Sequence, residues 1–447
     1  MSSNDITVAS NIQEKSISIS ASPVESFAVT PAVTPAVTTT DAPQSQPPDQ
    51  QPPQPLIYGK VPEEPTQEAV EGIRFDFNDG IRIKFPNDGY RVCFSDLDTG
   101  IILYNADVAA GAMVSSVKKF FIRFRLQIYR RGEDKPIFEH DYNAENKQVM
   151  IQLPVGTIGD SIGWFSYVER FQQKHKCQVL CVMTPWIADL FRESYPQLKF
   201  ITSDETLNYS PYACYYLGLF FRGNVDHQPS DFRYVGLHRT AGYILGVEPS
   251  DIPPRIKLDA KRKIKEPYVC IAVQSSSQAK HWNNPNGWRE VVKFLKESGY
   301  RVLCIDKSAA GGQGIVWNQI PNGAEDFTGD KPLQERADLL HHADFFIGLS
   351  SGLAWLAWCC HVPVVLISGF THPLNEFETP YRVINYHTCH SCWNDMRIDF
   401  DHFDFLWCPR HKNTDRHFEC TRLISSDQVI NTIKRIPAFE KHVNQSK

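Results

Sequence analysis

The sequence predicts an α/β protein with two Rossmann-like halves, a β-rich domain before them and a cysteine-rich segment after them. Residues 147–262 and 263–386 each alternate apolar strands with helical stretches, which is typical of a parallel sheet covered by helices. Residues 67–146 instead alternate apolar and polar residues around short turn sequences, which favours antiparallel strands. Residues 387–424 carry four cysteines at spacings typical of a metal finger.

Composition excludes several classes of protein. The chain has 447 residues, 46 of them basic and 51 acidic, so its formal net charge is −5. That length predicts about two or three domains. Hydrophobic residues make up 42% of the chain, enough for packed cores, so a wholly disordered chain is excluded. A mildly acidic chain lacks the basic stripe of a non-specific nucleic-acid binder, so we expect no nucleic-acid partner.

The ends of the chain differ from its middle. Residues 1–66 are rich in proline and nearly free of aromatic residues, which predicts a disordered tail with polyproline II character. The N-terminus has no secretory signal, and twelve cysteines are too sparse for a secreted disulfide scaffold, so we expect a reducing, cytoplasmic location. Residues 425–447 predict a C-terminal helix and tail.

One long uncharged stretch raises the question of a membrane span. Residues 345–371 contain no Lys, Arg, Asp or Glu and are long enough to cross a bilayer. They nevertheless divide into a strand, a small-residue turn, a short helix and a second strand. A buried α/β element is the better interpretation, and we expect no membrane insertion.

The β-rich domain shows two hairpin signals. Alternating runs flank Asn78-Asp79-Gly80, and a second pair flanks Asp98-Thr99-Gly100. A packing or assembly role suits this domain better than a catalytic one.

The two Rossmann-like halves after it are joined near residues 250–265, where prolines and charged residues break the pattern. Two such halves with a cleft between them describe a GT-B-like architecture. The glycines at 311–314 predict only a flexible connection.

The first chemistry-bearing segment is the glycine-rich turn from Gly156 to Gly163. After a strand, such a turn lets backbone N–H groups of Gly156, Thr157 and Ile158 approach a ligand, and the N-terminus of the next helix favours anions. Asp160 in this turn has two interpretations. It could cap the helix, or it could be a general base at the carboxyl edge of the sheet.

The second segment, QSSSQAKHWN, occupies residues 274–283 and follows the first strand of the second half. Polar side chains such as Gln274, together with one lysine, suit a diphosphate, with Lys280 as the point charge. The alternative is a polar surface loop with an exposed lysine.

The third segment opens a helix in the same half. Gly348, Ser350, Ser351 and Gly352 offer hydroxyls and backbone amides at a helix N-terminus, which suits a phosphate. The alternative is a tight turn with capping serines.

The cysteine segment is the most specific signal. Cys389 and Cys392 form a C-x-x-C pair, and Cys408 and Cys420 follow. Four thiolates of this kind predict a closed, structural metal finger, which we expect to dock on the second half or on a neighbouring subunit. Spacing alone favours zinc by default, although iron fits equally well and a neighbouring histidine could replace one thiol. Four unrelated reduced cysteines are the alternative.

The two halves resemble the lipopolysaccharide heptosyltransferases of the GT-B class. The turn GTIGD at residues 156–160 resembles their G-x-x-G-D turn, and GLSSGLAWLA at 348–357 resembles their donor-site motif. That motif usually has Thr and His where this chain has Ser351 and Trp355. The β-rich domain, the QSSSQAKHWN segment and the cysteine finger extend the resemblance to the bacterial autotransporter heptosyltransferases, over residues 70–435.

This resemblance implies transfer of heptose from ADP-heptose to Ser or Thr hydroxyls of an autotransporter adhesin passenger in the bacterial cytoplasm, before secretion. It implies Asp160 as the base and Lys280 on the donor diphosphate. It also implies one structural iron, as Fe³⁺, held by Cys389, Cys392, Cys408 and Cys420, and a homo-oligomer as large as a dodecamer.

Two other functions remain open. The chain could be a non-catalytic scaffold or chaperone for an adhesin, or a heptosyltransferase acting on lipopolysaccharide core sugars, although the latter needs neither the β-rich domain nor the finger. The D-x-D sequence Asp96-Leu97-Asp98 falls in a predicted hairpin turn, so we expect no catalytic Mg²⁺.

Overall fold

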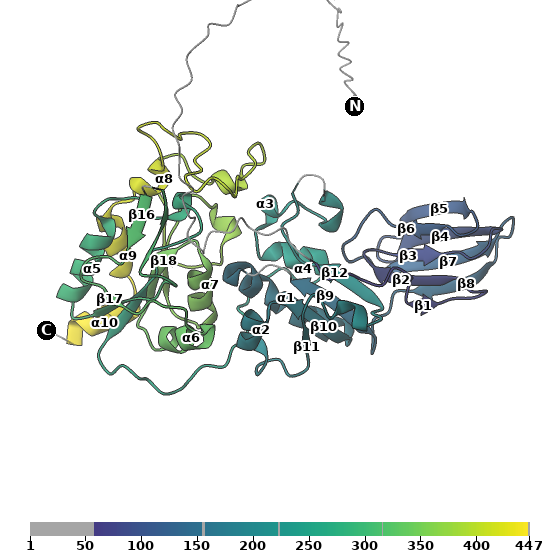
Figure 1. Cartoon of the computed structure of the whole chain (residues 1–447), viewed down its shortest axis with the longest axis horizontal. Coiled ribbons are helices and arrows are strands. Elements are labelled where there is room, and N and C mark those ends of the chain that lie inside the picture. Colours follow the sequence, from purple (N-terminus) through teal and green to yellow (C-terminus); the bar gives the residue numbers. More distant parts are fainter. Residues whose placement is uncertain (1–57, 154–156, 222–223, 315, 446–447) are drawn as a thin grey trace, which may run out of the picture. The chain divides into compact units, whose positions relative to one another are not determined.

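The computed structural model describes residues 58–153, 157–221, 224–314 and 316–445. Most of the predicted tail, and Gly156 of the glycine-rich turn, therefore lie outside the described residues. The predicted α/β class is confirmed: two largely parallel sheets carry helices, and an antiparallel sheet belongs to the N-terminal region (Figure 1).

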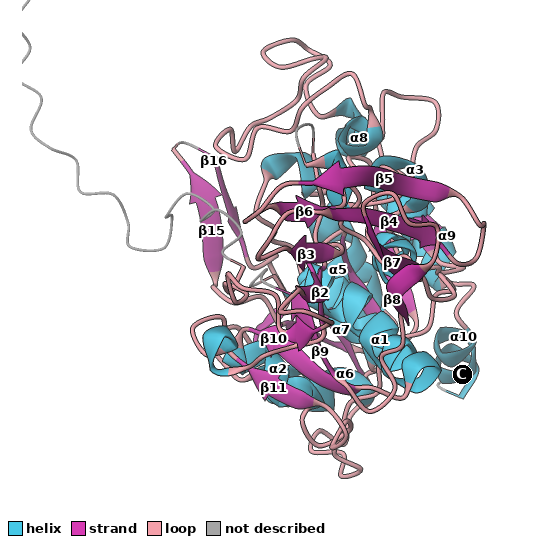
Figure 2. Ribbon diagram, turned by 90° about the vertical axis from the view of Figure 1, so that its right-hand side faces the viewer, coloured by secondary structure: helices cyan, strands magenta, loops and turns pink. Residues whose placement is uncertain are grey.

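The first sheet has the strand order β11-β10-β9-β12-β2-β3-β6, with β1 paired to β2. Its strands are β1 (Gln67–Glu68), β2 (Arg74–Asn78), β3 (Arg82–Lys84), β6 (Met113–Ser115), β9 (Gln148–Leu153), β10 (Gln178–Met183), β11 (Lys199–Ile201) and β12 (Ala213–Tyr216). Strands β11 to β2 run parallel, because β2 pairs in parallel with β12. The sheet of the first half therefore continues into strands of the β-rich region (Figure 2).

The second sheet is antiparallel, in the order β5-β4-β7-β8. Its strands are β4 (Tyr90–Asp96), β5 (Ile102–Val108), β7 (Phe124–Arg130) and β8 (Pro136–Asp141). Both predicted hairpins are confirmed: β2 turns into β3 and β4 into β5. Asp79 and Gly80 have φ of 69° and 78°, the left-handed values that a type I′ hairpin turn requires.

The third sheet is parallel, in the order β17-β14-β13-β18-β19-β20. Its strands are β13 (Tyr268–Ile271), β14 (Arg301–Cys304), β17 (Glu325–Asp326), β18 (Phe346–Leu349), β19 (Val364–Ile367) and β20 (Arg382–Val383). One face packs against α5 (Gly287–Glu297), α9 (Ser426–Ile433) and α10 (Pro437–Gln445), and the other against α6 (Leu333–His341) and α7 (Gly352–Cys359) (Figure 1). Two helices, α9 and α10, thus stand where the sequence predicts one.

The remaining elements are short, apart from α1. They are α1 (Ile158–His175), α2 (Pro185–Phe191), α3 (Phe232–Val235), α4 (Arg239–Leu245), α8 (Glu419–Arg422), β15 (Ala310–Gln313), β16 (Val316–Gln319) and five 3-10 turns, η1 (Thr206–Asn208), η2 (Val225–His227), η3 (Gln278–Lys280), η4 (Pro373–Asn375) and η5 (Cys392–Asn394).

The sequence predicted a flexible connection at the glycines of 311–314, and this prediction is wrong. They lie in and beside β15, which pairs with β16. A Cβ on Gly312 would lie 2.1 Å from the Val316 carbonyl oxygen, so glycine is needed for the close approach of the two backbones.

Strand order places two loop clusters at sheet edges that suit a ligand. In the first sheet β9 lies between β10 and β12, and in the third sheet β13 lies between β14 and β18. Beside β9 and beside β13, the connections that leave two neighbouring strands run in opposite directions. In parallel sheets this arrangement leaves a crevice at the carboxyl ends of those strands. The loops after β9, β13 and β18 carry the three predicted site segments.

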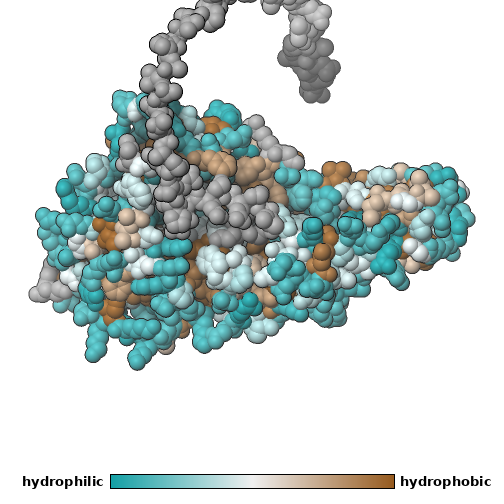
Figure 3. Space-filling model, viewed as in Figure 1, coloured by the Kyte–Doolittle hydropathy of each residue, from teal (hydrophilic) through white to brown (hydrophobic). Residues whose placement is uncertain are grey.

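The uncharged stretch forms β18, α7 and β19, as predicted. Among the described residues, every helix is too short or too polar to cross a bilayer. On the face shown in Figure 3, hydrophilic residues cover most of the described surface and apolar residues form small patches.

A buried charged network holds the start of the β-rich region together. The Asp76 carboxylate is fully buried and accepts two hydrogen bonds from Arg82, at 2.9 and 2.7 Å. It also accepts the backbone N–H of Thr66 at 3.1 Å and the Asn78 amide at 2.7 Å. Because all of these donors point at one carboxylate, its removal leaves a largely buried guanidinium without its partner.

We therefore expect Asp76→Ala to lower the free energy of opening of β2 and β3 by about 3–5 kcal/mol. Native-state hydrogen exchange of the β2 and β3 amides measures this locally. Asp98→Ala is the control, because Asp98 and its partner Arg123 are both about half exposed and such pairs contribute about 0–1 kcal/mol. Equal effects of the two substitutions would contradict the assignment.

Candidate active site and metal centre

The first site segment is a helix start rather than an extended turn. Helix α1 begins at Ile158 with Thr157 as its N-cap residue, so Gly159 and Gly163 lie inside the helix. The prediction that Asp160 caps the helix is therefore wrong, because Asp160 lies in the first turn. Its carboxylate accepts the hydroxyl hydrogen of Thr157 at 2.5 Å. This leaves the carboxylate at the carboxyl edge of the first sheet.

Asp160 interacts with Lys280 from the other half of the molecule. Both residues are partly buried. Burial raises the pKa of Asp160, while the Thr157 hydrogen bond and the positive charge of Lys280 oppose that rise. Burial likewise lowers the pKa of Lys280, and the Asp160 charge opposes that shift. A carboxylate from one half and a lysine from the other are thus close enough to interact.

Lys280 is carried by the loop after β13, whose beginning is held by a buried carboxylate. Asp306 accepts the backbone N–H groups of Val273 at 2.8 Å and Gln274 at 3.2 Å. Burial raises the pKa of Asp306 to about 6, against the effect of these hydrogen bonds. The Gln274 amide donates to the Ser308 carbonyl at 2.9 Å, so that end of the side chain is engaged within the protein.

A buried histidine organises the middle of the same loop. His281 Nε2 accepts the backbone N–H of Ser275 at 3.0 Å, so its proton is on Nδ1, which lies 3.2 Å from Gln278 Oε1. Burial lowers the pKa of His281 to about 4, which keeps the ring neutral. Asn283 donates to the carbonyls of Gln278 and His281, at 3.0 and 2.9 Å. The predicted alternative of an ordinary exposed loop is therefore wrong.

The third segment lies directly against the first. A Cβ on Gly352 would lie 2.8 Å from Ile158 Cβ and 3.3 Å from the Gly159 nitrogen, so the N-termini of α7 and α1 are in contact. Ser351 is the N-cap residue of α7 but makes no side-chain cap hydrogen bond, and the Ser350 hydroxyl pairs with Thr371 at 3.0 Å. The capping serines considered from the sequence are therefore not observed.

The cysteine segment packs behind the Lys280 loop. The Phe405 carbonyl accepts the Gln278 N–H at 3.0 Å and the Ser277 hydroxyl at 3.4 Å. Asn283 donates to the Thr421 hydroxyl at 2.9 Å, and Trp282 Nε1 donates to the Ile424 carbonyl at 3.0 Å. The fold of the finger therefore supports the backbone that presents Lys280.

The finger also reaches the first half. Asn394 donates to the Arg233 carbonyl at 3.1 Å, and the Trp393 ring lies 6.0 Å from Phe232 and 6.2 Å from Phe221. The prediction that the finger docks on the second half is confirmed, and these contacts extend it to both halves.

The four predicted metal ligands are close enough to influence one another electrostatically, although Cys389 alone of the four belongs to the group of possible ligand atoms that lie within 4.8 Å of one another among the described residues. Burial raises the pKa of Cys392 to about 12, and the neighbouring Cys389 and Cys408 add to this. Burial also raises the pKa of Cys420, to which the charges of the other three thiols contribute. Several neighbouring thiols form a soft donor set that fits iron or zinc.

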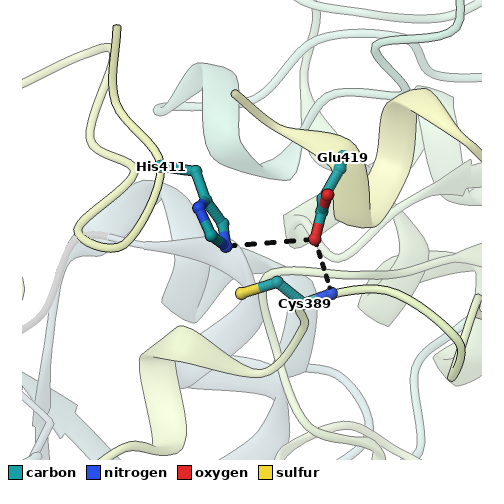
Figure 4. A group of neighbouring side chains, drawn as sticks. All are labelled: Cys389, His411 and Glu419. Carbon is teal, nitrogen blue, oxygen red and sulfur yellow. Dashed lines mark hydrogen bonds and ion pairs between the residues drawn. The ribbon is translucent and has the colours of Figure 1, made fainter. Parts of the chain in front are cut away.

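Cys389 also has two non-sulfur neighbours, His411 and Glu419 (Figure 4). Their possible ligand atoms all lie within 4.8 Å of one another. Glu419, however, accepts two hydrogen bonds from Arg416, at 2.8 and 2.7 Å, and the backbone N–H of Cys389 at 2.9 Å. Its oxygens are therefore engaged in orienting the Cys389 backbone, which favours the thiols as metal ligands.

Sequence reasoning missed His281, Asp306 and the finger's contact through Phe405. His281 belongs to the polar segment at residues 274–283 that was predicted as a site because of Lys280. The sequence did not indicate that His281 organises the loop. Asp306 follows β14 and had the signal of a polar residue at a strand's carboxyl end. The Phe405 contact uses a backbone carbonyl, for which the sequence has no signal.

Two Rossmann-like halves that meet through loops at the carboxyl ends of their strands have the architecture of the GT-B class of glycosyltransferases. Comparison with known proteins narrows this class. Residues 70–132 match the N-terminal domain of glycosyltransferase TibC, and residues 249–393 match glycosyltransferase family 9 (heptosyltransferase).

The similarity to curated proteins extends over most of the chain. It is 54% identical over 378 residues to autotransporter heptosyltransferase Aah of Escherichia coli, covering 85% of this chain and 96% of that protein. It is 55% identical over 375 residues to autotransporter heptosyltransferase TibC of Escherichia coli, covering 84% and 92%. The chain belongs to the autotransporter heptosyltransferase family, as the sequence motifs predicted.

Crystal structures of TibC have the same fold. One, described as a bacterial iron-containing dodecameric glycosyltransferase, matches with a TM-score of 0.82 at 53% identity, covering 87% of this chain and 100% of that one. Another, the dodecameric iron-containing heptosyltransferase with ADP-D-beta-D-heptose, has a TM-score of 0.83 at 53% identity, covering 86% and 100%.

One relative shows that family membership alone does not establish transfer. The chain is 44% identical over 378 residues to inactive autotransporter heptosyltransferase BimC of Burkholderia thailandensis, covering 84% of this chain and 88% of that protein. Activity must therefore be argued from the site of this chain.

We expect Cys408→Ser to lose the metal of the finger and to expose residues 387–424 to protease, because metal binding supplies folding free energy to a segment with few helices or strands. Metal analysis and limited proteolysis of the full chain measure both effects. Cys93→Ser, which changes a buried thiol of β4, is the control and should keep the metal. Full metal content in Cys408→Ser would contradict this ligand assignment.

Proposed function

We propose that this chain transfers heptose from ADP-heptose to Ser or Thr hydroxyls of an autotransporter passenger. The observation that carries the proposal is the electrostatic interaction between Asp160 and Lys280, which follow strands of the two halves at the carboxyl edges of their sheets. The family, and the ADP-D-beta-D-heptose bound by its member TibC, support the donor.

The proposed reaction is a single inverting displacement. Asp160 accepts the proton of the passenger hydroxyl while the hydroxyl oxygen forms a bond to the anomeric carbon of heptose. The bond from that carbon to the diphosphate oxygen breaks on the opposite side, and ADP leaves with the electron pair. A positioned base of this kind contributes about 10²–10⁴-fold to the rate.

The donor would lie between the two halves. Lys280 would stabilise the charge that develops on the diphosphate, in a partly buried position where such interactions are stronger than in water. We assign the other donor contacts to Gly156, Thr157, Ile158, Gln274, Gly348, Ser350, Ser351 and Gly352. The mechanism uses no Mg²⁺.

We further propose that Cys389, Cys392, Cys408 and Cys420 hold one iron, as Fe³⁺, with zinc as the alternative. TibC, which contains iron, supports this assignment, as does the neighbourhood of the four thiols. The metal would cross-link the loops of the finger, and thiolate-bound Fe³⁺ would colour the protein whereas zinc would not. TibC also supports assembly as a dodecamer.

The location we propose is the bacterial cytoplasm, where the passenger can be modified before secretion. None of the twelve cysteines, all of which lie among the described residues, forms a disulfide, which suits a reducing compartment.

BimC makes a second function worth testing. A family member without transferase activity could serve as a scaffold or chaperone for an adhesin, and BimC shares 44% identity with this chain. Such a protein has no need of a base facing a lysine across the two halves. A lipopolysaccharide-core acceptor is disfavoured, because it needs neither the β-rich region nor the finger.

The decisive experiment incubates the full chain with ADP-heptose and a recombinant passenger fragment and measures the intact mass of the fragment. We expect increments of one heptose, and a rate at least about 100-fold lower for Asp160→Asn. Asp204→Asn, in an exposed loop of the first half, is the control and should keep the wild-type rate.

Each other outcome has a separate meaning. Near-wild-type transfer by a folded Asp160→Asn variant would contradict the base assignment. Transfer to a lipopolysaccharide acceptor but not to the passenger would contradict the acceptor. Neither transfer nor ADP-heptose binding by the wild-type chain would favour the scaffold.

The acid side of the pH profile should report Asp160. Burial raises its pKa, so the carboxylate takes up a proton at a higher pH than an exposed aspartate does. A base acts only when ionised, so kcat/KM should fall as the pH decreases through this raised pKa and level off above it. The residual activity of Asp160→Asn should lack this fall, and an identical profile in that variant would assign the titration to another group.

A further inference from the structure

Helices α1 and α7 are in direct backbone contact, and one large side chain lies at that contact. Gly159 and Gly163 are four residues apart, so they lie on the same face of α1. Trp355 of α7 faces both glycines. The first turns of α1, which carry Asp160, therefore lie against the indole of the donor-binding half.

The distances leave no room for a side chain on α1. A Cβ on Gly159 would lie 2.9 Å from Trp355 Cδ1 and 3.3 Å from its Nε1. A Cβ on Gly163 would lie 3.3 Å from Trp355 Cζ3 and 3.2 Å from His238 Cβ. Real Cβ contacts are essentially never shorter than 3.0 Å, so the indole requires glycine at 159, whereas a Cβ at 163 would need His238 and Trp355 to shift by a few tenths of an ångström.

Trp355 is surrounded on its other sides as well and is only 5% exposed. The ring of His238 lies 5.3 Å from it, and His238 Nε2 is held 2.6 Å from Asp251. Phe377 and Trp358 lie 5.0 and 5.6 Å away. A bulky ring packed on every side has little freedom to shift, so it defines where the glycine face of α1 can lie.

We infer that Trp355 is a positioning residue for heptosyl transfer: it fixes the first turn of α1, and with it the Asp160 carboxylate, relative to the loops of the donor-binding half. This inference rests on the proposed role of Asp160 as the base. It also gives a physical role to a position where this chain has Trp in place of the His usual in the similar heptosyltransferase motif.

The expected signature is a change in kcat rather than in donor binding. A displacement of about 1 Å can cost about 100-fold in rate, so kcat should fall by about 10- to 100-fold in Trp355→Leu and in Gly159→Ala. The KM for ADP-heptose should stay within about threefold, because Lys280 and the loop after β13 are not changed. Trp186→Leu is the control, since Trp186 lies on α2 and is 48% exposed.

The test is the double variant Gly159→Ala/Trp355→Leu. Removing the indole makes room for the new methyl group, so we expect the two losses not to add: kcat of the double variant should be close to that of Trp355→Leu alone. The readout that a merely structural role would not give is a loss confined to kcat, with an unchanged KM for ADP-heptose. Hydrogen exchange of the α1 amides should show the same pattern, which keeps the inference testable if one variant is too slow to assay.

The outcomes separate this inference from the proposed function. If wild type transfers heptose and Asp160→Asn does not, unchanged kcat in Trp355→Leu and Gly159→Ala, or independent effects in the double variant, would overturn the positioning role alone. If wild type does not transfer heptose, or Asp160→Asn does, the proposed function fails first.

Discussion

The contact between α1 and α7 is the constraint on which the rest of the site depends. Each helix starts at the carboxyl edge of its own sheet, and Gly159, Gly163 and Gly352 let the two starts approach to backbone distance. A Cβ at Gly159 or at Gly352 would lie less than 3.0 Å from an atom of the other half, so a side chain at either position would force the two helix starts to shift. Because neither position carries one, the carboxylate on one helix and the lysine presented by the other half share a partly buried site, where each shifts the other's protonation equilibrium.

The finger supports the same site through hydrogen bonds to the loop that carries Lys280. Its Phe405 carbonyl and Thr421 hydroxyl accept hydrogen bonds from the loop that carries Lys280, while Asn394 contacts the first half. Within the loop, His281 accepts the backbone N–H of Ser275, and at its start Asp306 accepts the backbone N–H of Val273. A lysine so supported has little backbone reorganisation left to undergo when an anion binds. The cysteine segment is thus coupled through hydrogen bonds to the loop that we propose as part of the donor site.

Much of this arrangement could be predicted from local sequence patterns. Residues close together in the chain predict the alternation of strands and helices in both halves and the two hairpins. They also single out Asp160 and Lys280 as candidate site residues. The joining of β2 to β12 could not be predicted, because it pairs segments more than 130 residues apart. The start of α1 at Ile158 was misplaced because glycine usually signals a turn, whereas Gly159 and Gly163 serve the approach of another helix. The β15–β16 hairpin was missed for the same reason.

The most direct measurement of this account is the affinity of the full chain for ADP-heptose, determined by calorimetry with the finger metal present and after its removal. If the finger supports the Lys280 loop, metal removal should weaken binding by at least about tenfold, equivalent to about 1.4 kcal/mol. Restoring the metal should restore the affinity. Equal affinities, with metal analysis confirming that the finger is empty in one sample, would contradict the coupling of the finger to the donor site.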